Sequence, residues 1–139
     1  MKFAKTLSRN DLGVNGSHQS GFLVPKSIKN LLDFLPSLDS TELNPSTWID
    51  FYDTQGKKWE FRYIYYNNKL HAEKGTRNEY RITWTTTFMK ENNAVEGDTV
   101  FLFKDEDGQY RIYLEKQSTQ AGSVENSNRI KLSGWRQVY

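Results

Sequence analysis

The sequence predicts a mainly β domain with two short helices, and three observations support this prediction. Aromatic residues make up 14% of the 139 residues, a share that favours pleated sheet. Residues 58–65 alternate between polar and aromatic side chains, which is typical of a half-buried strand. The Asp107-Gly108 pair separates two further β-rich runs and strongly indicates a hairpin.

The other strands are expected in short runs of β-branched and aromatic residues that are bounded by turns. These runs are residues 3–7, 22–24, 48–52, 81–84, 99–104 and 109–114. A turn at Gln55-Gly56 should join residues 48–52 to residues 58–65.

Helical patterning is limited to two places. Pro25 can open a helix in which apolar side chains recur at helical spacing, and Pro36 ends it. The apolar positions are Ile28, Leu31, Leu32 and Leu35. A second, short helix is expected around Phe88 and Met89, after a threonine-rich stretch.

Charge is segregated along the chain, although the net charge is only +2. Basic residues dominate the first thirty positions and residues 57–81, whereas acidic residues collect at 33–42 and 91–107. This distribution predicts a basic face that attracts phosphates, with an ordinary mixed surface as the alternative.

Neither a catalytic residue nor a metal site is expected in this chain. It contains no cysteine, which excludes zinc fingers and cysteine-based catalysis. Residues 105–107 are acidic because they occupy a hairpin turn, and His18 and His71 lack the spacing of metal ligands. No apolar run approaches the roughly 20 residues of a membrane span, so a cytoplasmic protein with no membrane partner is expected.

Two long polar segments interrupt the predicted strands, and we call residues 9–21 the first arm and residues 67–79 the second arm. Loops of about 12 residues or more are uncommon within compact domains and are usually functional or disordered. Both arms are rich in Asn, Gln, His, Arg and Lys, whose side chains hydrogen-bond to base edges in the major groove. They predict a DNA-binding surface, with a pair of flexible surface loops as the alternative.

Arg77, Glu79 and Arg81 are spaced by two residues, so in an extended segment they project from the same side. Arginine makes paired hydrogen bonds to guanine O6 and N7, and glutamate accepts one from the cytosine amino group. The spacing therefore predicts a cluster that reads G·C pairs. An internal salt-bridged cluster that rigidifies the second arm is the alternative.

In the first arm, His18 and Gln19 lie between two glycines, on a segment suited to enter a groove. Gln19 and Asn10 can each address adenine through paired donor and acceptor contacts. Asn10 and Asp11 can instead form a turn.

The four tryptophans suggest a different class of function. Trp48, Trp59, Trp84 and Trp135 could stack against a carbohydrate or a peptide. Because they lie in or beside predicted strands, we expect them to pack in the core.

A set of motifs concentrated in the two arms resembles the N-terminal effector-binding domain of EcoRII-type restriction endonucleases over residues 5–85. The matching residues are Leu7-Ser8, Asn10-Asp11, Gly13, Gly16, His18-Gln19, Gly21, Pro25, Pro36-Ser37, Asn44-Pro45-Ser46, Ile64-Tyr65-Tyr66-Asn67, Thr76-Arg77-Asn78-Glu79 and Arg81-Ile82-Thr83. Further on, Glu96-Gly97-Asp98 resembles the family pattern that leads into the last hairpin. Ser17 replaces a glycine of the family, and Tyr80 lies where a basic residue is expected.

The resemblance implies a B3-like DNA-binding pseudobarrel of about seven strands and two helices over residues 1–116. Residues 117–139 would be a linker or a C-terminal extension towards a separate nuclease domain. The implied function is major-groove binding of double-stranded DNA at a 5′-CCWGG-like site, as the effector domain of a bacterial type II (IIE-like) restriction endonuclease. A B3-like domain of another restriction enzyme, with a different short site, is the alternative. No cofactor is expected for this domain, since Mg²⁺ would serve the nuclease domain.

The expected DNA contacts are of two kinds. The residues expected to contact bases are Asn10, His18, Gln19, Arg77, Asn78, Glu79 and Arg81. The residues expected to contact phosphates are Lys5, Arg9, Lys69, Lys74, Tyr66 and Asn67.

Overall fold

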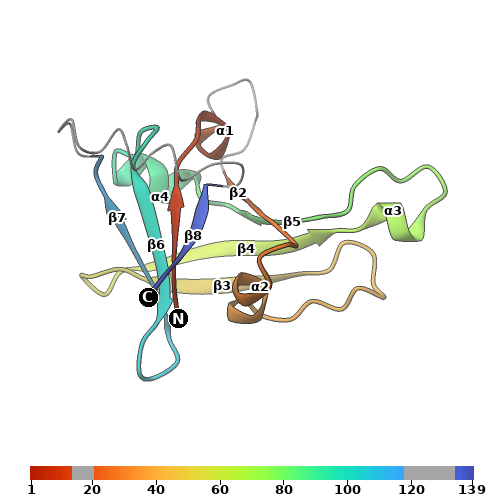
Figure 1. The fold of residues 1–139 in the computed structure, drawn as a ribbon, viewed down its shortest axis with the longest axis horizontal. Coiled ribbons are helices and arrows are strands. Elements are labelled where there is room, and N and C mark those ends of the chain that lie inside the picture. Colours follow the sequence, from red (N-terminus) through yellow and green to blue (C-terminus); the bar gives the residue numbers. More distant parts are fainter. Residues whose placement is uncertain (14–20, 118–133) are drawn as a thin grey trace.

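The computed structural model describes residues 1–13, 21–117 and 134–139, which form eight strands and four short helices (Figure 1). The strands are β1 (Lys2–Thr6), β2 (Gly21–Val24), β3 (Ser46–Tyr52), β4 (Lys58–Tyr66), β5 (Glu79–Thr83), β6 (Thr99–Lys104), β7 (Tyr110–Glu115) and β8 (Trp135–Val138). The helices are α1 (Arg9–Leu12), α2 (Lys29–Phe34), α3 (Asn68–His71) and α4 (Thr86–Glu91). The mainly β prediction is confirmed. Two of the four helices, α1 and α3, were not predicted, and each lies within one of the arms.

All eight strands belong to one sheet, in the order β2-β5-β4-β3-β7-β6-β1-β8. Neighbouring strands are antiparallel except β3 and β7, which run parallel where Tyr52 lies opposite Arg111. The Arg111 guanidinium donates hydrogen bonds to the carbonyl oxygens of Tyr52 and Asp53, at 3.1 and 2.9 Å. These bonds reinforce the junction between the two halves of the sheet.

The two predicted turns are confirmed by their backbone. Gly56, between β3 and β4, has φ 81°, and Gly108, between β6 and β7, has φ 78°. Both values lie in the left-handed region that glycine adopts without steric cost.

β8 lies within residues 117–139, which were expected to be a linker or extension. It pairs antiparallel with β1, with Trp135 opposite Lys5. The Trp135 ring meets Phe22 edge-on at 5.9 Å, and its Nε1–H donates to the carbonyl oxygen of Leu23 at 2.8 Å. Because β8 and β2 are the two ends of the sheet order, this contact curls the sheet towards closure. The folded unit therefore extends beyond residue 116.

The interior of the curled sheet is filled by aromatic and aliphatic side chains from both halves of the sheet. The largest fully buried ones include Phe3, Phe22, Phe51, Phe61, Tyr63, Ile82, Leu102 and Ile112. α2 contributes Leu31 and Phe34, and α4 contributes Phe88 and Met89. None of the helices in the described part of the chain is long and apolar enough to cross a membrane.

The prediction that all four tryptophans pack in the core is right for two and wrong for two. Trp59 and Trp135 are 7% exposed, whereas Trp48 is 52% and Trp84 is 66% exposed. Trp48 points away from the core because its neighbour Ile49 takes the inward side of β3. Trp84 follows the last residue of β5 and leaves the strand with φ 64°.

The Asp98 side chain connects the turn before β6 to the end of β7 through hydrogen bonds. This residue is 0% exposed. Its carboxylate accepts hydrogen bonds from the backbone N–H groups of Val95 and Gln117 and from Lys116 Nζ, at 2.9, 2.8 and 2.7 Å. Burial opposes ionisation of the carboxyl group, but these donors outweigh it and hold the pKa of Asp98 below its ordinary value.

The stability of the domain should therefore depend on Asp98 in mild acid. A carboxyl group whose pKa is lowered by folding stabilises fully above its unfolded-state pKa of about 4. That contribution is lost as the pH falls through the lower folded-state pKa. We expect Asp98→Asn to lower the free energy of unfolding at neutral pH by about 2 kcal/mol and to flatten the decline in acid.

Urea unfolding of both proteins across the acid range measures this effect. Glu106→Gln is the matched control, because Glu106 is exposed and the substitution removes the same charge. Identical pH profiles for Asp98→Asn and the unsubstituted protein would contradict the prediction.

Candidate nucleic-acid interface

The second arm is folded back on itself around α3. Its backbone is held at both ends, since Lys69 N–H donates to the Arg77 carbonyl oxygen at 3.0 Å and Arg77 N–H donates to Asn68 Oδ1 at 2.7 Å. At Gly75 a Cβ would overlap the carbonyl oxygen of Asn68, so the chain requires glycine there. Neither Asn68 nor Gly75 was predicted from the sequence, although asparagine at the start of a loop commonly bonds to nearby backbone.

Asn67 was expected to contact phosphate but is fully buried. It exchanges two bonds with Asn44: Asn44 N–H donates to Asn67 Oδ1 at 2.7 Å, and Asn67 N–H donates to Asn44 Oδ1 at 3.1 Å. Its Nδ2 also donates to the carbonyl oxygens of Ser40 and Glu42, at 3.2 and 2.8 Å. Asn67 thus anchors the base of the second arm to the segment before β3, and we do not assign it a DNA contact.

Arg77, Glu79 and Arg81 form one cluster at the base of the second arm, as their spacing predicts. The Glu79 carboxylate lies 3.2 Å from Arg77 Nε and 3.5 Å from Arg81 NH1. The Arg77 guanidinium also lies over the Tyr66 ring, 3.6 Å from its centroid, in cation–π geometry. The side chains of Arg77, Glu79 and Arg81 remain 41%, 32% and 26% exposed, so the cluster is ordered and still accessible.

Asn78 and Tyr80, which alternate with these residues in the sequence, both contact Tyr65. Asn78 is half-buried and accepts a hydrogen bond from the Tyr65 hydroxyl through its Oδ1. Tyr80 stacks on the Tyr65 ring, with centroids 4.1 Å apart and planes at 8°, and burial raises the pKa of its hydroxyl. Tyr80 therefore lies on the inner face of β5, whereas Arg81 lies on the outer face. This inward position is why an aromatic residue suits residue 80.

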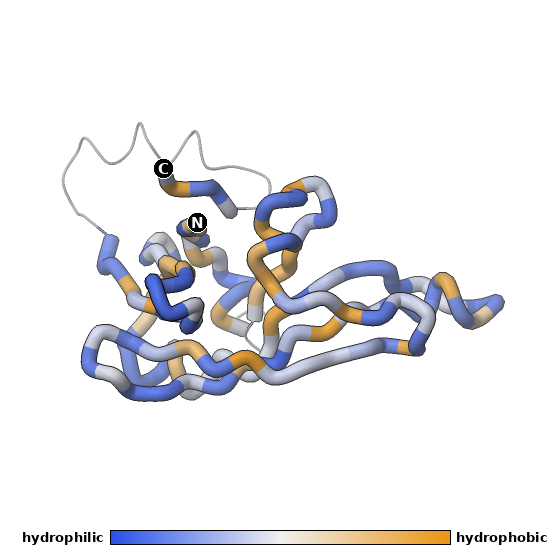
Figure 2. Tube along the Cα trace, turned by 90° about the horizontal axis from the view of Figure 1, so that it is seen from below, coloured by the Kyte–Doolittle hydropathy of each residue, from blue (hydrophilic) through white to orange (hydrophobic). Residues whose placement is uncertain are grey.

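Lys69 and Lys74 are exposed on the second arm. Figure 2 shows the arm extending away from the body of the domain, with polar residues over much of its length. His71 is also exposed, and its Nε2 lies 2.9 Å from the carbonyl oxygen of Ser40. The two lysines are therefore placed where a phosphate could reach them.

The first arm begins with a capped turn of helix. Ser8 Oγ accepts from Asp11 N–H at 3.2 Å, and the Asp11 carboxylate accepts from Ser8 N–H at 2.8 Å, which forms a capping box. Asp11 thus has the turn-forming role that the sequence offered as an alternative. The rest of the first arm up to residue 20, with His18 and Gln19, lies outside the described residues, so their DNA contacts remain predictions.

Lys5 was expected to contact phosphate, and the structure gives it a different role. It is 4% exposed, and its Nζ lies 2.8 Å from Asp11 Oδ2. Its Nζ also donates to the carbonyl oxygen of Thr6 at 3.3 Å. Lys5 therefore anchors α1 to the sheet, and we do not assign it a phosphate.

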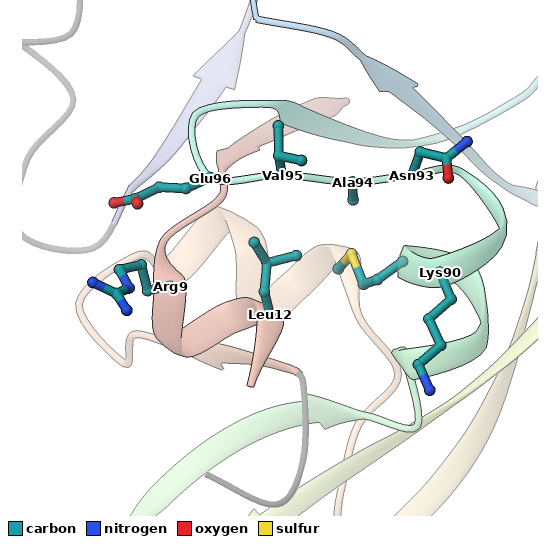
Figure 3. Close-up of a pocket in the computed structure, with 8 residues that line it drawn as sticks. Arg9, Leu12, Lys90, Asn93, Ala94, Val95 and Glu96 are labelled. Carbon is teal, nitrogen blue, oxygen red and sulfur yellow. The ribbon is translucent and has the colours of Figure 1, made fainter. Parts of the chain in front are cut away.

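Arg9 and Asn10 are exposed on α1. Beside them lies an open pocket of about 600 Å³ between α1 and the segment that joins α4 to β6 (Figure 3). Leu12, Ala94 and Val95 line its middle, and Arg9 stands at its rim. Arg9 is therefore on an accessible edge of the first arm.

α1, at the start of the first arm, and the second arm lie in different parts of the molecule, with β2 and β5 between them (Figure 1). The first arm joins the sheet at Gly21, which lies opposite Thr83 of β5, and a Cβ at Gly21 would meet the Ile82 carbonyl oxygen at 2.6 Å. The second arm joins the other end of β5.

Among the described residues, no group of three or more His, Cys, Asp or Glu side chains is placed to hold a metal ion.

Comparison with known proteins finds similar sequences among the auxin response factors of plants. Auxin response factor 3 of Oryza sativa subsp. japonica is 32% identical over 114 residues, and auxin response factor 4 of Arabidopsis thaliana is 28% identical over 125 residues. The matches cover 82% and 90% of this chain but only 14% of each relative. The chain therefore corresponds to a small part of those proteins.

Two solved structures share the fold. The Arabidopsis FUS3–DNA complex superposes with a TM-score of 0.62 at 25% identity, covering 83% of this chain and 96% of that one. The B3 domain of the UbaLAI restriction endonuclease, with cognate DNA, superposes with a TM-score of 0.58 at 20% identity, covering 97% and 84%. The B3-like pseudobarrel implied by the resemblance is thereby confirmed, with eight strands in place of about seven.

The family model described as "Restriction endonuclease EcoRII, N-terminal" matches residues 1–128. This match includes both arms and β1 to β7. The chain belongs to the family of the N-terminal domain of restriction endonuclease EcoRII.

Proposed function

We propose that this chain binds a short specific sequence of double-stranded DNA by inserting its two arms into the major groove. The observation that supports this most directly is the cluster of Arg77, Glu79 and Arg81. Its side chains are held in place by ion pairs and by the Tyr66 ring, yet remain accessible at the base of a projecting arm. An ordered arginine loses less conformational freedom on binding than a mobile one, which favours affinity.

The chemistry of the cluster suits G·C pairs. Arginine donates two hydrogen bonds to guanine O6 and N7, and glutamate accepts from the cytosine amino group. A G/C-flanked site such as 5′-CCWGG presents these groups. We propose base contact for Arg77, Glu79, Asn10, His18 and Gln19, base or phosphate contact for Arg81, and phosphate contact for Arg9, Lys69, Lys74 and Tyr66. Asn78, whose Oδ1 accepts from the Tyr65 hydroxyl, would contact a base through its Nδ2.

The domain itself is proposed to be the non-catalytic, target-recognition part of a type II (IIE-like) restriction endonuclease. In that arrangement a separate nuclease domain cuts the DNA and uses Mg²⁺. A second candidate is a B3-like domain that reads a different short site. The similarity to auxin response factors favours it, since those proteins are not restriction enzymes by name.

Binding selection from random duplexes tests the proposal and separates the two candidates. Recovery of a 5′-CCWGG-like sequence supports the first candidate's recognition site, and recovery of another short sequence supports the second candidate. Recovery of no common sequence would contradict both.

The purified chain should bind its preferred duplex without nicking it, with or without Mg²⁺. A supercoiled plasmid that carries the selected site is a sensitive substrate, because a single nick relaxes it. Site-specific nicking by the chain alone would show that the non-catalytic assignment is wrong.

Lys69 and Lys74 should contribute affinity without sequence preference, because phosphates carry no base identity. Each neutralised phosphate adds about −0.9 to the slope of log K against log salt. We expect Lys69→Ala or Lys74→Ala to weaken binding to preferred and unrelated duplexes alike and to make that slope shallower by about one unit.

Fluorescence anisotropy at several salt concentrations measures both effects. Lys58→Ala is the matched control, because Lys58 is exposed at the other end of β4, away from the second arm. A changed preferred sequence in either arm variant would mean that the lysine contacts a base.

A further inference from the structure

Trp48 and Trp84 form a pair of exposed rings on the outer surface of the sheet. Their ring centroids are 5.4 Å apart and their planes cross at 68°, an edge-to-face arrangement. They are 52% and 66% exposed, although tryptophan is normally buried over most of its surface. An exposed aromatic pair of this kind indicates an interaction site.

The backbone presents Trp84 outwards at a conformational cost. Its φ of 64° lies in the left-handed region, which bulky residues rarely adopt. The residues on either side, Thr83 and Thr85, are buried, and the Thr83 hydroxyl donates to the Arg62 carbonyl oxygen at 3.3 Å. Strained conformations held by their surroundings are typical of functional positions.

The strand register places Trp48 on the same face as the second-arm cluster, and the ring contact places Trp84 beside Trp48. Thr83 lies opposite Arg62, and Arg62 lies opposite Trp48. Two residues along β5, Arg81 lies opposite Ile64, and a further two along, Glu79 lies opposite Tyr66. Directly opposed residues share a face and alternate residues along a strand do so too.

The pair also lies close to the first arm, because Gly21, where that arm enters the sheet, is opposite Thr83. The Trp48–Trp84 pair therefore continues the proposed interface between the two arms. Arg62, which lies between Thr83 and Trp48 in the sheet, adds a positive charge, and its guanidinium donates to Ser46 Oγ at 3.1 and 3.2 Å. Asp50 and Glu60 occupy the next row outwards and set the limit of any surface that attracts phosphate.

The spacing fits the width of a groove. Glu79 and Thr83 are four positions apart on β5, or about 14 Å along an extended strand. The major groove of B-DNA is about 12 Å wide. The two lengths are similar, so a surface that places Arg77 and Glu79 at base edges is long enough for the tryptophan pair to meet the sugar–phosphate backbone beside the groove.

We propose that Trp48 and Trp84 form a third contact with DNA, in which the ring faces pack on deoxyribose and an indole N–H donates to a phosphate oxygen. This inference rests on the proposed DNA-binding function. The contact contributes affinity and register, and it does not read base identity.

Tryptophan fluorescence tests the contact directly, because the other two tryptophans are buried. Labelled-duplex anisotropy reports binding, and acrylamide quenching reports the accessibility of the exposed pair in the same titration. Binding should protect the pair from acrylamide. Trp48→Phe/Trp84→Phe, which keeps Trp59 and Trp135, should lose this DNA-dependent protection.

Trp84→Gly provides the sharpest variant, because glycine suits φ 64° and the fold should be retained or stabilised. We expect this variant to unfold no more easily than the unsubstituted protein and to bind preferred and mismatched duplexes about five- to tenfold more weakly. Leu43→Gly at another exposed apolar position is the control.

Two results would overturn the inference, and they are distinguishable. If the duplex binds while the pair stays open to acrylamide and Trp84→Gly binds normally, the aromatic contact is wrong and the proposed function stands. If no duplex binds at all, the proposed function fails and the aromatic contact fails with it.

Discussion

Arg77→Ala and Glu79→Ala should each lose discrimination at one G·C pair of the preferred site while the domain stays folded. A good bidentate contact contributes about 1–3 kcal/mol of discrimination, so the preference over the single-base variant should fall about 5- to 150-fold. The structure adds a coupling between the two variants, because Glu79 also lies within 3.2 Å of Arg77 and 3.5 Å of Arg81. Glu79→Ala should therefore also loosen both arginines and weaken binding to every duplex.

Anisotropy titrations against the preferred duplex and its single-base variants measure this. Lys74→Ala and Glu73→Ala are matched controls, since each removes the same charge from an exposed position of the same arm. Unchanged discrimination at every base pair in both test variants would leave the cluster only its structural role, that of a salt-bridged support for the arm.

Features set by local patterns were predictable from the sequence. The alternation of residues 58–65 identified β4, because successive side chains of a strand point to opposite faces. The two-residue spacing of Arg77, Glu79 and Arg81 correctly predicted that they meet. Asp107-Gly108 marked its hairpin, since its glycine adopts φ 78°.

Features that depend on distant partners were not predictable. Asn67 looked like a polar arm residue, but its side chain is satisfied by Asn44, 23 positions away. β8 pairs with β1 across almost the entire chain, and although residues 129–139 are amphipathic, their pattern does not identify β1 as the partner. The exposure of Trp84 depends on a single backbone angle that favours glycine, which a tryptophan in the sequence does not suggest.

Lys5 shows most clearly how burial changes an assignment. In the sequence it is one of several basic residues beside the first arm, and a phosphate contact was the natural prediction. In the structure its side chain is 6% exposed and that of Asp11 is 8% exposed, with 2.8 Å between Nζ and Oδ2. The same Asp11 carboxylate also caps α1 through Ser8 N–H, so this ion pair connects the start of the first arm to β1.

Lys5→Met should therefore lower stability rather than the salt dependence of DNA binding. Removing one partner of a buried ion pair leaves the other charge uncompensated and typically costs about 3–5 kcal/mol. Such a loss is a large part of the roughly 5–15 kcal/mol that stabilises a domain, so the urea midpoint should fall steeply. Lys5→Met/Asp11→Asn should recover part of it, because the double variant no longer buries an unpaired carboxylate.

Arg9→Met is the matched control, since it removes the same charge from an exposed position on α1. It should change the free energy of unfolding by less than about 0.5 kcal/mol, as surface substitutions generally do, and make the salt slope of DNA binding shallower. The two variants thus separate a cation that supports the arm from a cation that faces the phosphates. The opposite pattern, with Lys5→Met stable and its salt slope shallower, would return Lys5 to the DNA-binding surface and contradict the buried ion pair.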